Sequence, residues 1–369
     1  MQSRKSLNAV DLFCGAGGFS LSAIRSGFNI KFAIDSDPHS TDTYRRNICQ
    51  LPGNKRTEVY AKDILRCDPM EFKTRHFKNQ ACDLVLGGPP CQGFSTHRIL
   101  DSGVRDPRNK LIYSYFDFVR ILRPTVFLME NVPGILWDRH KPYLQRFYRE
   151  GKAAGYLLQN PIVLDARDYG VPQRRKRVFV LGIRNDIDLN NLEWPPSPSH
   201  TGHSSDASVL PKWLACRSVF KNYPKNDPNS QRMKNSPEIV ETFKNTPKNG
   251  GSRADSGRIL PCHVDHDGHK DVYGRIDPKF PAPTMTTACI NPSKGRFVHP
   301  TRNSGITVRE AARIQTFPDD FIFSGGLMSA GQQVGNAVPI EMGVALMKSI
   351  KKFVRSQHAA PSKLNKNVA

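Results

Sequence analysis

The chain has 369 residues, 38% of them hydrophobic, and carries a formal net charge of +21 with a sequence pI near 9.8. This length predicts a large domain with a smaller partner, and the hydrophobic content is enough for a core that folds without disulfides. The positive charge favours a polyanionic partner. Because no apolar run approaches the roughly 20 residues of a membrane-spanning helix, we expect that partner to be nucleic acid and not a membrane.

The cysteines indicate the cellular setting. The chain contains 8 of them, scattered without a repeated spacing, and residues 1–5 lack the apolar core of a signal peptide. This pattern predicts a protein of a reducing, intracellular compartment.

The N-terminal region predicts a strand, a glycine-rich turn and a helix. Residues 8–13 are strand-like, Gly15 and Gly17 lie in the turn, and residues 19–26 are compatible with a helix. Asp35 ends a second strand (29–34), and Asp63 follows a further one. Such a unit suits an adenosine cofactor, although the turn lacks the third glycine of the G-x-G-x-x-G fingerprint and could also be a tight connection only.

Four strands are expected, at residues 8–13, 29–34, 82–86 and 125–129, with helical stretches between them. This alternation predicts an α/β fold with a doubly wound, mostly parallel sheet. In such sheets ligands bind beyond the carboxyl ends of the strands.

Two chemically active side chains follow these strands. Cys91 lies on a glycine- and proline-framed turn after the third strand, as a nucleophile would, although a buried structural thiol is the alternative. Glu130 ends the fourth strand, where a carboxyl group is costly unless it is hydrogen-bonded or used. Residues 96–109 between them are expected to form a charged, mobile loop or an ordinary surface loop.

The chain resembles the DNA cytosine-5 methyltransferases in three motifs, at residues 11–18, 89–92 and 130–132. Residues 173–177 are similar to the family's Q-x-R-x-R motif, 309–315 to its R-E-A-A-R-x-Q helix, and 333–339 to its last motif. The motifs occur in the family's order and cover nearly the whole chain apart from residues 194–300. The fold implied is the Rossmann-like fold of methyltransferases that use S-adenosylmethionine.

The resemblance implies a catalytic set. Cys91 would add as a thiolate to carbon 6 of a flipped-out cytosine, so that carbon 5 can accept a methyl group. Glu130 would protonate N3, and Arg177 would hold the cytosine carbonyl and orient Glu130. Arg175 is the other arginine of this motif and is included in the catalytic set. No residue can be assigned as the base that removes the C5 proton.

The resemblance also implies binding residues. S-adenosylmethionine is the expected cofactor and double-stranded DNA the expected substrate. The residues expected to bind the cofactor are Phe13, Gly15, Gly17, Asp35, Asp63, Pro89 and Asn336. Those expected to contact DNA are Gln92, Ser95, Arg98 and Gln173.

Composition divides the chain. Residues 194–300 hold 14 of the 28 prolines and 15 Lys and Arg against 9 Asp and Glu, with little periodicity. We expect residues 1–193 to form the catalytic and cofactor-binding domain, 194–300 a smaller, irregular target recognition domain, and 301–355 a return to the catalytic domain. Residues 356–369 are expected to be a disordered basic tail.

Two local patterns complete the sequence. The stretch from Cys262 to His269 holds four possible metal ligands, but its spacing matches no structural zinc site, so we expect a polar loop and no metal. Thr307 and Glu310 have the spacing of a capping box that opens a helix over residues 309–316.

Three alternatives remain. A transfer-RNA cytosine methyltransferase would use the same chemistry, but the long 194–300 stretch favours DNA. A DNA-binding regulator on an inactive fold is expected to have lost Cys91, Glu130 or Arg177, and all three are present. A nicotinamide oxidoreductase would be dismissed by binding of S-adenosylmethionine without NAD.

The biological setting follows from the compact chain. No extra reader or zinc-finger domain precedes the catalytic motifs, which favours a stand-alone prokaryotic modification enzyme. We expect a monomer in the cytoplasm, associated with the nucleoid, and consider a cognate restriction endonuclease as a genetic partner.

Overall fold

The computed structural model describes residues 6–89, 109–202, 210–258 and 271–359. Within these ranges one mixed sheet has the strand order β3-β2-β1-β4-β5-β8-β6, and β7 also pairs with β8. The strands are β1 (Leu7–Leu12), β2 (Phe28–Asp35), β3 (Glu58–Ala61), β4 (Leu84–Gly87), β5 (Val126–Asn131), β6 (Tyr156–Leu158), β7 (Ile162–Asp165) and β8 (Lys176–Arg184).

The first five strands of the chain are parallel to one another, whereas β8 is antiparallel to β5, β6 and β7. On the side of β8 away from β5, residues 176–179 pair with β7 and residues 182–184 with β6, so β6 and β7 together form the outer edge of the sheet. The predicted doubly wound, mostly parallel sheet is confirmed.

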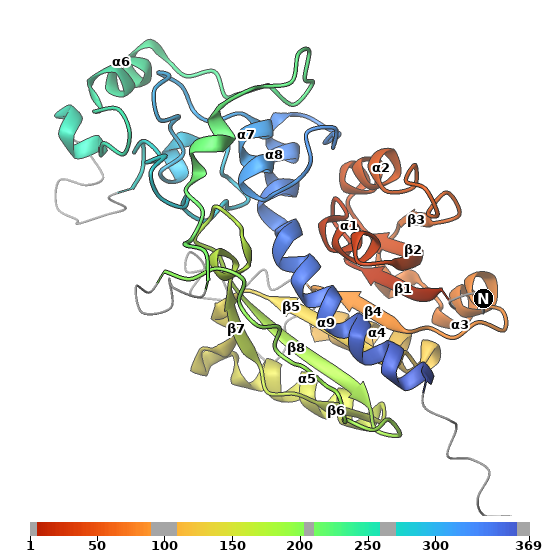
Figure 1. The fold of residues 1–369 in the computed structure, drawn as a ribbon. Coiled ribbons are helices and arrows are strands. Elements are labelled where there is room, and N and C mark those ends of the chain that lie inside the picture. The colour runs from red at the N-terminus through yellow and green to blue at the C-terminus, as the bar shows by residue number, and fades with distance from the viewer. Residues whose placement is uncertain (1–5, 90–108, 203–209, 259–270, 360–369) are drawn as a thin grey trace, which may run out of the picture.

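Helices cover both faces of the sheet. They are α1 (Gly18–Arg25), α2 (Pro38–Asn47), α3 (Pro69–His76), α4 (Asn109–Leu122), α5 (Lys141–Ala153), α6 (Pro237–Asn245), α7 (Val308–Ile314), α8 (Leu327–Asn336) and α9 (Ile340–Ala359). One apolar cluster packs α1 and α9 against the sheet, and a second packs α3, α4 and α5 against the opposite face. In Figure 1, α9 descends from α8 and runs along the sheet beside β8, from which it is far apart in sequence.

Residues 194–300 are built differently. Their regular structure within the described ranges is α6, short 3₁₀ helices and isolated bridges. They occupy the upper end of the molecule in Figure 1, next to α7 and α8. A third apolar cluster joins this region to the glycine turn, to α2 and to residues 306–344. The proposed target recognition domain therefore shares its core with the large domain.

The structure extends the sequence-based element assignments. The four expected strands and the helix opened by Thr307 are present, and the Thr307–Glu310 capping box forms as predicted. The expected start of the disordered tail is wrong, because α9 continues to Ala359. Phe353 and Val354 near its end are buried, and their packing holds the last turns in helical form.

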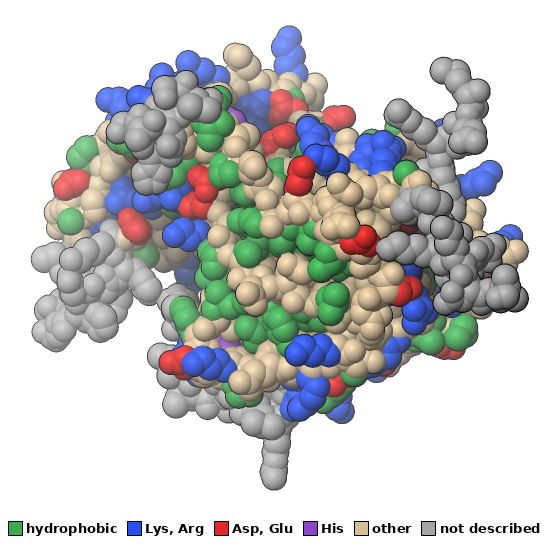
Figure 2. All heavy atoms as spheres, turned by 60° about the horizontal axis from the view of Figure 1, so that its bottom comes forward, with side chains coloured by type: hydrophobic (Ala, Val, Ile, Leu, Met, Phe, Trp, Pro, Cys, Tyr) green, Lys and Arg blue, Asp and Glu red, His purple; other side chains and the backbone are tan. Residues whose placement is uncertain are grey.

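None of the described helices has the length and apolar content needed to cross a membrane. Figure 2 views the end of the molecule that is lowest in Figure 1. Hydrophobic side chains gather in the middle of this face, and Lys and Arg surround them.

Candidate active site

The predicted site residues gather at one edge of the sheet. Phe13 and Gly15 follow β1, Asp35 ends β2, Pro89 follows β4, and Glu130 is the penultimate residue of β5. Because β1, β2, β4 and β5 are parallel neighbours, their carboxyl ends meet at the same edge. The topology therefore brings the expected cofactor residues and the expected catalytic carboxyl together.

The glycine turn has a backbone that few other residues could adopt. Gly15 has φ +52° and Gly17 has φ +92°. A Cβ on Gly17 would lie 2.8 Å from Tyr44 Cδ2, whereas a Cβ on Gly15 would meet nothing within 4 Å. Gly17 thus permits close packing on α2, and Gly15 leaves open space above the turn. Phe13 also has a positive φ of 61°, a strained conformation for an aromatic residue.

Asp35 ties the turn to β2. Its Oδ2 accepts the backbone N–H of Gly15 at 2.8 Å, and its Oδ1 accepts that of Asp37 at 2.9 Å. Burial raises the pKa of Asp35, and the two backbone donors oppose that rise. Each carboxylate oxygen keeps a lone pair free, so Asp35 can still accept hydrogen bonds from a ligand's hydroxyl groups.

Two further expected cofactor residues are exposed. Asp63 caps a 3₁₀ helix by accepting the backbone N–H of Leu65 at 3.0 Å. Asn336 is the last residue of α8 and is exposed to solvent. Both side chains are accessible to a ligand, and their roles in cofactor binding stay predictions.

Sequence reasoning missed a buried polar chain beneath the turn. Tyr44 donates its hydroxyl to Ser20 Oγ, and Ser20 donates to Asp11 Oδ2, both at 2.7 Å. Burial raises the pKa of Asp11 to about 7, and the negative charge of Asp35 adds to the rise. The signal that could have revealed Asp11 was an acidic residue inside the buried strand β1.

Cys91, Gln92, Ser95 and Arg98 lie outside the described residues, so their predicted roles stay predictions. The chain leading to Cys91 is described as far as Pro89. A Cβ on Gly88 would lie 3.2 Å from Glu130 Oε2, and the carbonyl of Pro89 accepts the side-chain amide of Asn131 at 3.2 Å. The segment that precedes Cys91 therefore packs directly on the end of β5.

Glu130 pairs with Arg177 across two neighbouring strands. Arg177 Nε lies 2.9 Å from Glu130 Oε1, and the two side chains are only 12% and 14% exposed. Burial raises the pKa of Glu130, and Arg177 and then Arg175 partly oppose that rise. The arrangement gives a nearly buried carboxyl group that is oriented by a guanidinium and poised to hold a proton.

Arg175 has a different environment from Arg177. It is fully buried and donates to three carbonyls: Met285 at 2.7 Å, Gly335 at 2.8 Å and Ala337 at 2.9 Å. Burial lowers the pKa of Arg175, and the charge of Arg177 lowers it further. Arg175 thus joins the strand entering the active site to the 194–300 region and to the segment around Asn336.

Gln173 was expected to contact DNA, but its side chain is fully buried. Its amide donates to Gln315 Oε1 at 2.7 Å and its carbonyl accepts the backbone N–H of Met285, also at 2.7 Å. These internal bonds occupy both ends of the amide, and the structure gives Gln173 no access to a bound duplex. A buried glutamine next to the exposed Arg174 could not be recognised from sequence.

Helix α7 holds the 194–300 region by charged contacts. Arg309 makes a two-point ion pair with Asp227, at 2.7 and 3.1 Å, with 1% and 4% side-chain exposure. Glu310 is fully buried and accepts hydrogen bonds from Tyr223 at 2.7 Å and Arg302 at 2.6 Å. These contacts join α7 to the 194–300 region.

The described residues contain no group of three or more His, Cys, Asp or Glu that could bind a metal. The stretch from Cys262 to His269 lies outside them, so the expectation of a polar loop without metal stays a prediction.

Comparison with known proteins gives the family. The family model for C-5 cytosine-specific DNA methylases matches residues 7–352. The chain is 32% identical over 353 residues to the Type II methyltransferase M1.HphI of Haemophilus parahaemolyticus, covering 94% of this chain and 87% of that protein. It is 33% identical to the Type II methyltransferase M.MthTI of Methanothermobacter thermautotrophicus, covering 94% and 97%.

Solved structures support the fold. A DNA modification methyltransferase encoded within an Escherichia coli prophage aligns with a TM-score of 0.69 at 23% identity, over 95% of this chain and all of that one. The DNMT2 of Spodoptera frugiperda aligns with a TM-score of 0.59 at 17% identity, over 94% and 100%. From the match of nearly its whole length and its similarity to these relatives, the chain belongs to the C-5 cytosine-specific DNA methylases.

Proposed function

We propose that this protein transfers a methyl group from S-adenosylmethionine to carbon 5 of a flipped-out cytosine in a specific duplex DNA sequence. The observation that carries the proposal is the buried Glu130–Arg177 pair, which lies against the segment leading to Cys91. The names of the relatives as Type II methyltransferases favour a role in protecting DNA within a restriction-modification system. The protein would act as a monomer with a restriction endonuclease as its genetic partner.

The residues around the glycine turn fit an adenosine-bearing cofactor. Gly15 leaves open space over the end of β1, Phe13 supplies an aromatic surface, and Asp35 has acceptor capacity for hydroxyl groups. Asp63, Pro89 and Asn336 complete the set by resemblance. When bound, S-adenosylmethionine supplies an electrophilic methyl group on a sulfonium.

Cys91, Glu130 and Arg177 would each have a different role in the reaction of cytosine. The thiolate of Cys91 adds to carbon 6, which forms a carbon–sulfur bond and moves electron density onto carbon 5 and toward N3. Glu130 gives its proton to N3, and its raised pKa favours the protonated form that this step requires. Arg177 keeps Glu130 in place and can also bind the cytosine carbonyl. After carbon 5 is methylated, loss of its proton to a base expels Cys91.

Base flipping is required by the duplex itself. Carbon 6 of a stacked, paired cytosine is out of reach of a side chain at a sheet edge, so the base must leave the helix. Gln92, Ser95 and Arg98 are proposed to contact the DNA around it. The same chemistry would methylate cytosine in transfer RNA. The experiment below therefore distinguishes duplex DNA from transfer RNA as the substrate.

Bisulfite sequencing of plasmid DNA from cells that express the protein tests activity and target sequence together. We expect methylated cytosine at one short sequence. The absence of methylation above background with confirmed intact protein would overturn the proposal, and methylation of transfer RNA but not of duplex DNA would reassign the substrate.

A covalent trap tests the nucleophile. DNA containing 5-fluorocytosine lacks the C5 proton whose loss releases the enzyme, so we expect a stable protein–DNA adduct. Cys91→Ser should abolish the adduct, whereas Cys82→Ser, before β4 at the opposite edge of the sheet, should leave it intact. An adduct that survives Cys91→Ser would assign the nucleophile elsewhere.

A further inference from the structure

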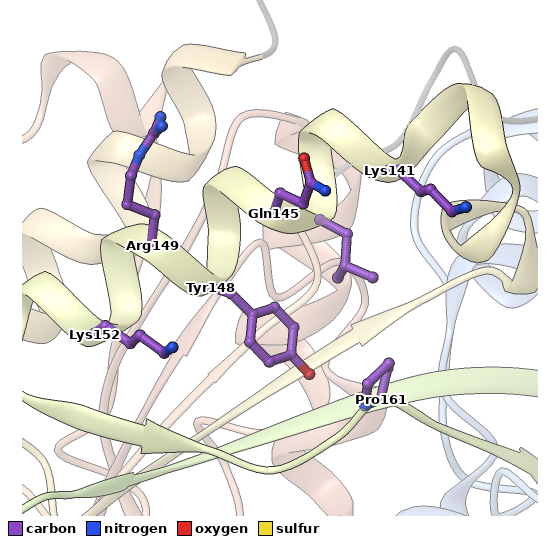
Figure 3. Close-up of a pocket in the computed structure, with 7 residues that line it drawn as sticks. Lys141, Gln145, Tyr148, Arg149, Lys152 and Pro161 are labelled. Atoms are coloured by element: carbon purple, nitrogen blue, oxygen red, sulfur yellow. The ribbon is translucent and has the colours of Figure 1, made fainter.

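A groove lies between α5 and the outer edge of the sheet, away from the glycine turn. It has a volume of about 520 Å³ and runs between α5 and the connection from β6 to β7. Leu144, Tyr148 and Pro161 form its apolar surface. Figure 3 shows Tyr148 pointing from α5 toward Pro161, with Lys141 and Lys152 toward the two ends of the view.

One wall of the groove is fixed by a hydrogen bond. The Tyr148 hydroxyl donates to the carbonyl of Gln159 at 2.7 Å, which ties α5 to the residues that separate β6 from β7. The ring of Tyr148 and the side chain of Leu144 also pack on the core beneath α5. The apolar surface is therefore held in place by the fold and is not a chance gap between loose side chains.

The charge around the groove has one sign. Lys141, Arg149 and Lys152 line it, and no acidic residue does. Lys141 pairs with Asp138 at 2.7 Å, but both side chains are largely exposed, so the pair contributes little. Glu150 on the same helix is already bound by Arg120. Within the described part of the chain, Arg149 and Lys152 have no acidic partner.

The sheet edge beside the groove is unpaired in the described residues but is poorly suited to adding another strand. β6 has three residues and β7 four, and Pro161 stands between them. Short strands and a proline are the usual protections of an edge. Exposed Val163, whose partner Val178 lies on the α5 side of the sheet, nevertheless extends the apolar surface along it. An occupant would therefore use side chains in the groove more than backbone pairing.

We propose that this groove is a docking site for an acidic protein segment that carries a large apolar anchor residue. The apolar floor needs a hydrophobic side chain, and the basic surroundings need carboxylates beside it. The phosphates of a nucleic acid could pair with the basic side chains, but they would make no favourable contact with the apolar surface of the groove. A second copy of this chain is disfavoured because the net charge is +21, and the chain's own ends carry Arg4, Lys5, Lys363 and Lys366 without an acidic residue.

The site is separate from the catalytic pair. Ile162, next to Pro161, pairs with Phe179, and Phe179 pairs with Glu130 on the other side of β8. Two strand spacings, or roughly 10 Å, therefore separate the edge from the backbone of Glu130. A partner in the groove could hold the enzyme in an assembly and leave the catalytic edge open.

The test measures binding of a fluorescein-labelled dodecapeptide, with a central Leu-Phe pair flanked by Glu and Asp, to the full-length protein. A second peptide replaces Leu-Phe by Ala-Ala. We expect the first peptide to bind about tenfold more tightly than the second. Equal binding of both peptides would show charge attraction alone and overturn the proposal.

Charge-reversal variants locate the site. Lys141→Glu/Lys152→Glu should weaken binding of the Leu-Phe peptide about tenfold or more. The control Lys348→Glu/Arg355→Glu makes the same change in net charge on exposed positions of α9 and should change binding less than about twofold. Equal losses in both double variants would contradict the proposal. Methylation by the α5 variant should match the wild type, since neither residue belongs to the catalytic machinery.

Two competitors decide between classes of partner. If a short DNA duplex displaces the peptide completely, the peptide occupies the DNA site and the groove is not its receptor. The second competitor is a vesicle that contains anionic lipid. If the protein binds such vesicles through Lys141 and Lys152 but does not bind the Leu-Phe peptide, the groove faces a lipid surface and the proposal of a protein partner is wrong.

Discussion

Arg175 is predicted to act by holding three segments together, so its replacement should change stability and cofactor binding. In Arg175→Met a side chain of similar length keeps the apolar contacts but removes the donors to Met285, Gly335 and Ala337. Each hydrogen bond from a charged donor contributes about 1.5–3 kcal/mol to stability. The variant no longer has to bury a charged guanidinium, and this gain offsets part of the loss of the three hydrogen bonds. We expect a net loss of about 3–5 kcal/mol in the free energy of unfolding.

Urea unfolding measures that loss, and titration calorimetry with S-adenosylmethionine measures its effect on the cofactor. Because Gly335 and Ala337 flank Asn336, we expect the cofactor's Kd to rise about tenfold. Arg175→Lys keeps the charge but has no planar fork to reach separate carbonyls, and it should fall between the wild type and Arg175→Met.

Arg174→Met is the matched control, since Arg174 is the exposed neighbour in sequence. A loss for Arg175→Met within about 0.5 kcal/mol of the control would refute the positioning role. A loss of kcat with unchanged stability and unchanged cofactor affinity would instead return Arg175 to the catalytic set.

Three further changes test the site. Folding raises the pKa of Asp11 from 3.8 to about 7, so the folded state keeps a proton that the unfolded state has lost. Stability is therefore lost as the pH rises, by about 2 kcal/mol between about pH 5.5 and about pH 8.5, and Asp11→Asn should remove that slope in urea unfolding. Gly335→Ala places a Cβ 2.1 Å from the carbonyl oxygen of Thr286 and should cost about 1–3 kcal/mol, whereas Gly326→Ala, with nothing within 4 Å, should be nearly neutral. Glu130→Gln should lower the rate of methyl transfer about 10²–10⁴-fold without unfolding the protein, and the wild-type rate should fall as pH rises through the raised pKa of Glu130. A wild-type rate that rises over that range would contradict the proton-donating role.

The sequence predicted the parallel part of the sheet because its strands are strongly apolar and each ends in a distinctive residue. Asp35, Pro89 and Glu130 could be assigned to one edge from topology alone. β6 and β7 were missed because they have three and four residues and lie on an exposed edge, where the apolar pattern is weak. The polar chain through Asp11 was missed because hydrogen bonding between distant side chains leaves no local pattern.

The arginines of the irregular region show where composition misleads. The excess of Lys and Arg between residues 194 and 300 was one reason to expect a target recognition domain there. Arg275, however, is fully buried and donates to the carbonyls of Phe243, Thr246, His299 and Arg302 and to the side chain of Asn303. A chain with little helix or sheet leaves many carbonyls without backbone donors, and a guanidinium supplies five N–H groups in one rigid group.

The same solution recurs at Arg296, which donates to the carbonyls of Gly250, Gly251 and Arg275, and at Arg313, which donates to those of Val219, Lys221 and Asn222. Such arginines act as substitutes for secondary structure, and they are not available to phosphates. The charge of residues 194–300 that is available to phosphates is therefore smaller than the residue count, and it resides in the lysines and in exposed arginines such as Arg217. It follows that removing a buried arginine should unfold this region at any ionic strength, whereas removing an exposed cation should weaken DNA binding most at low salt.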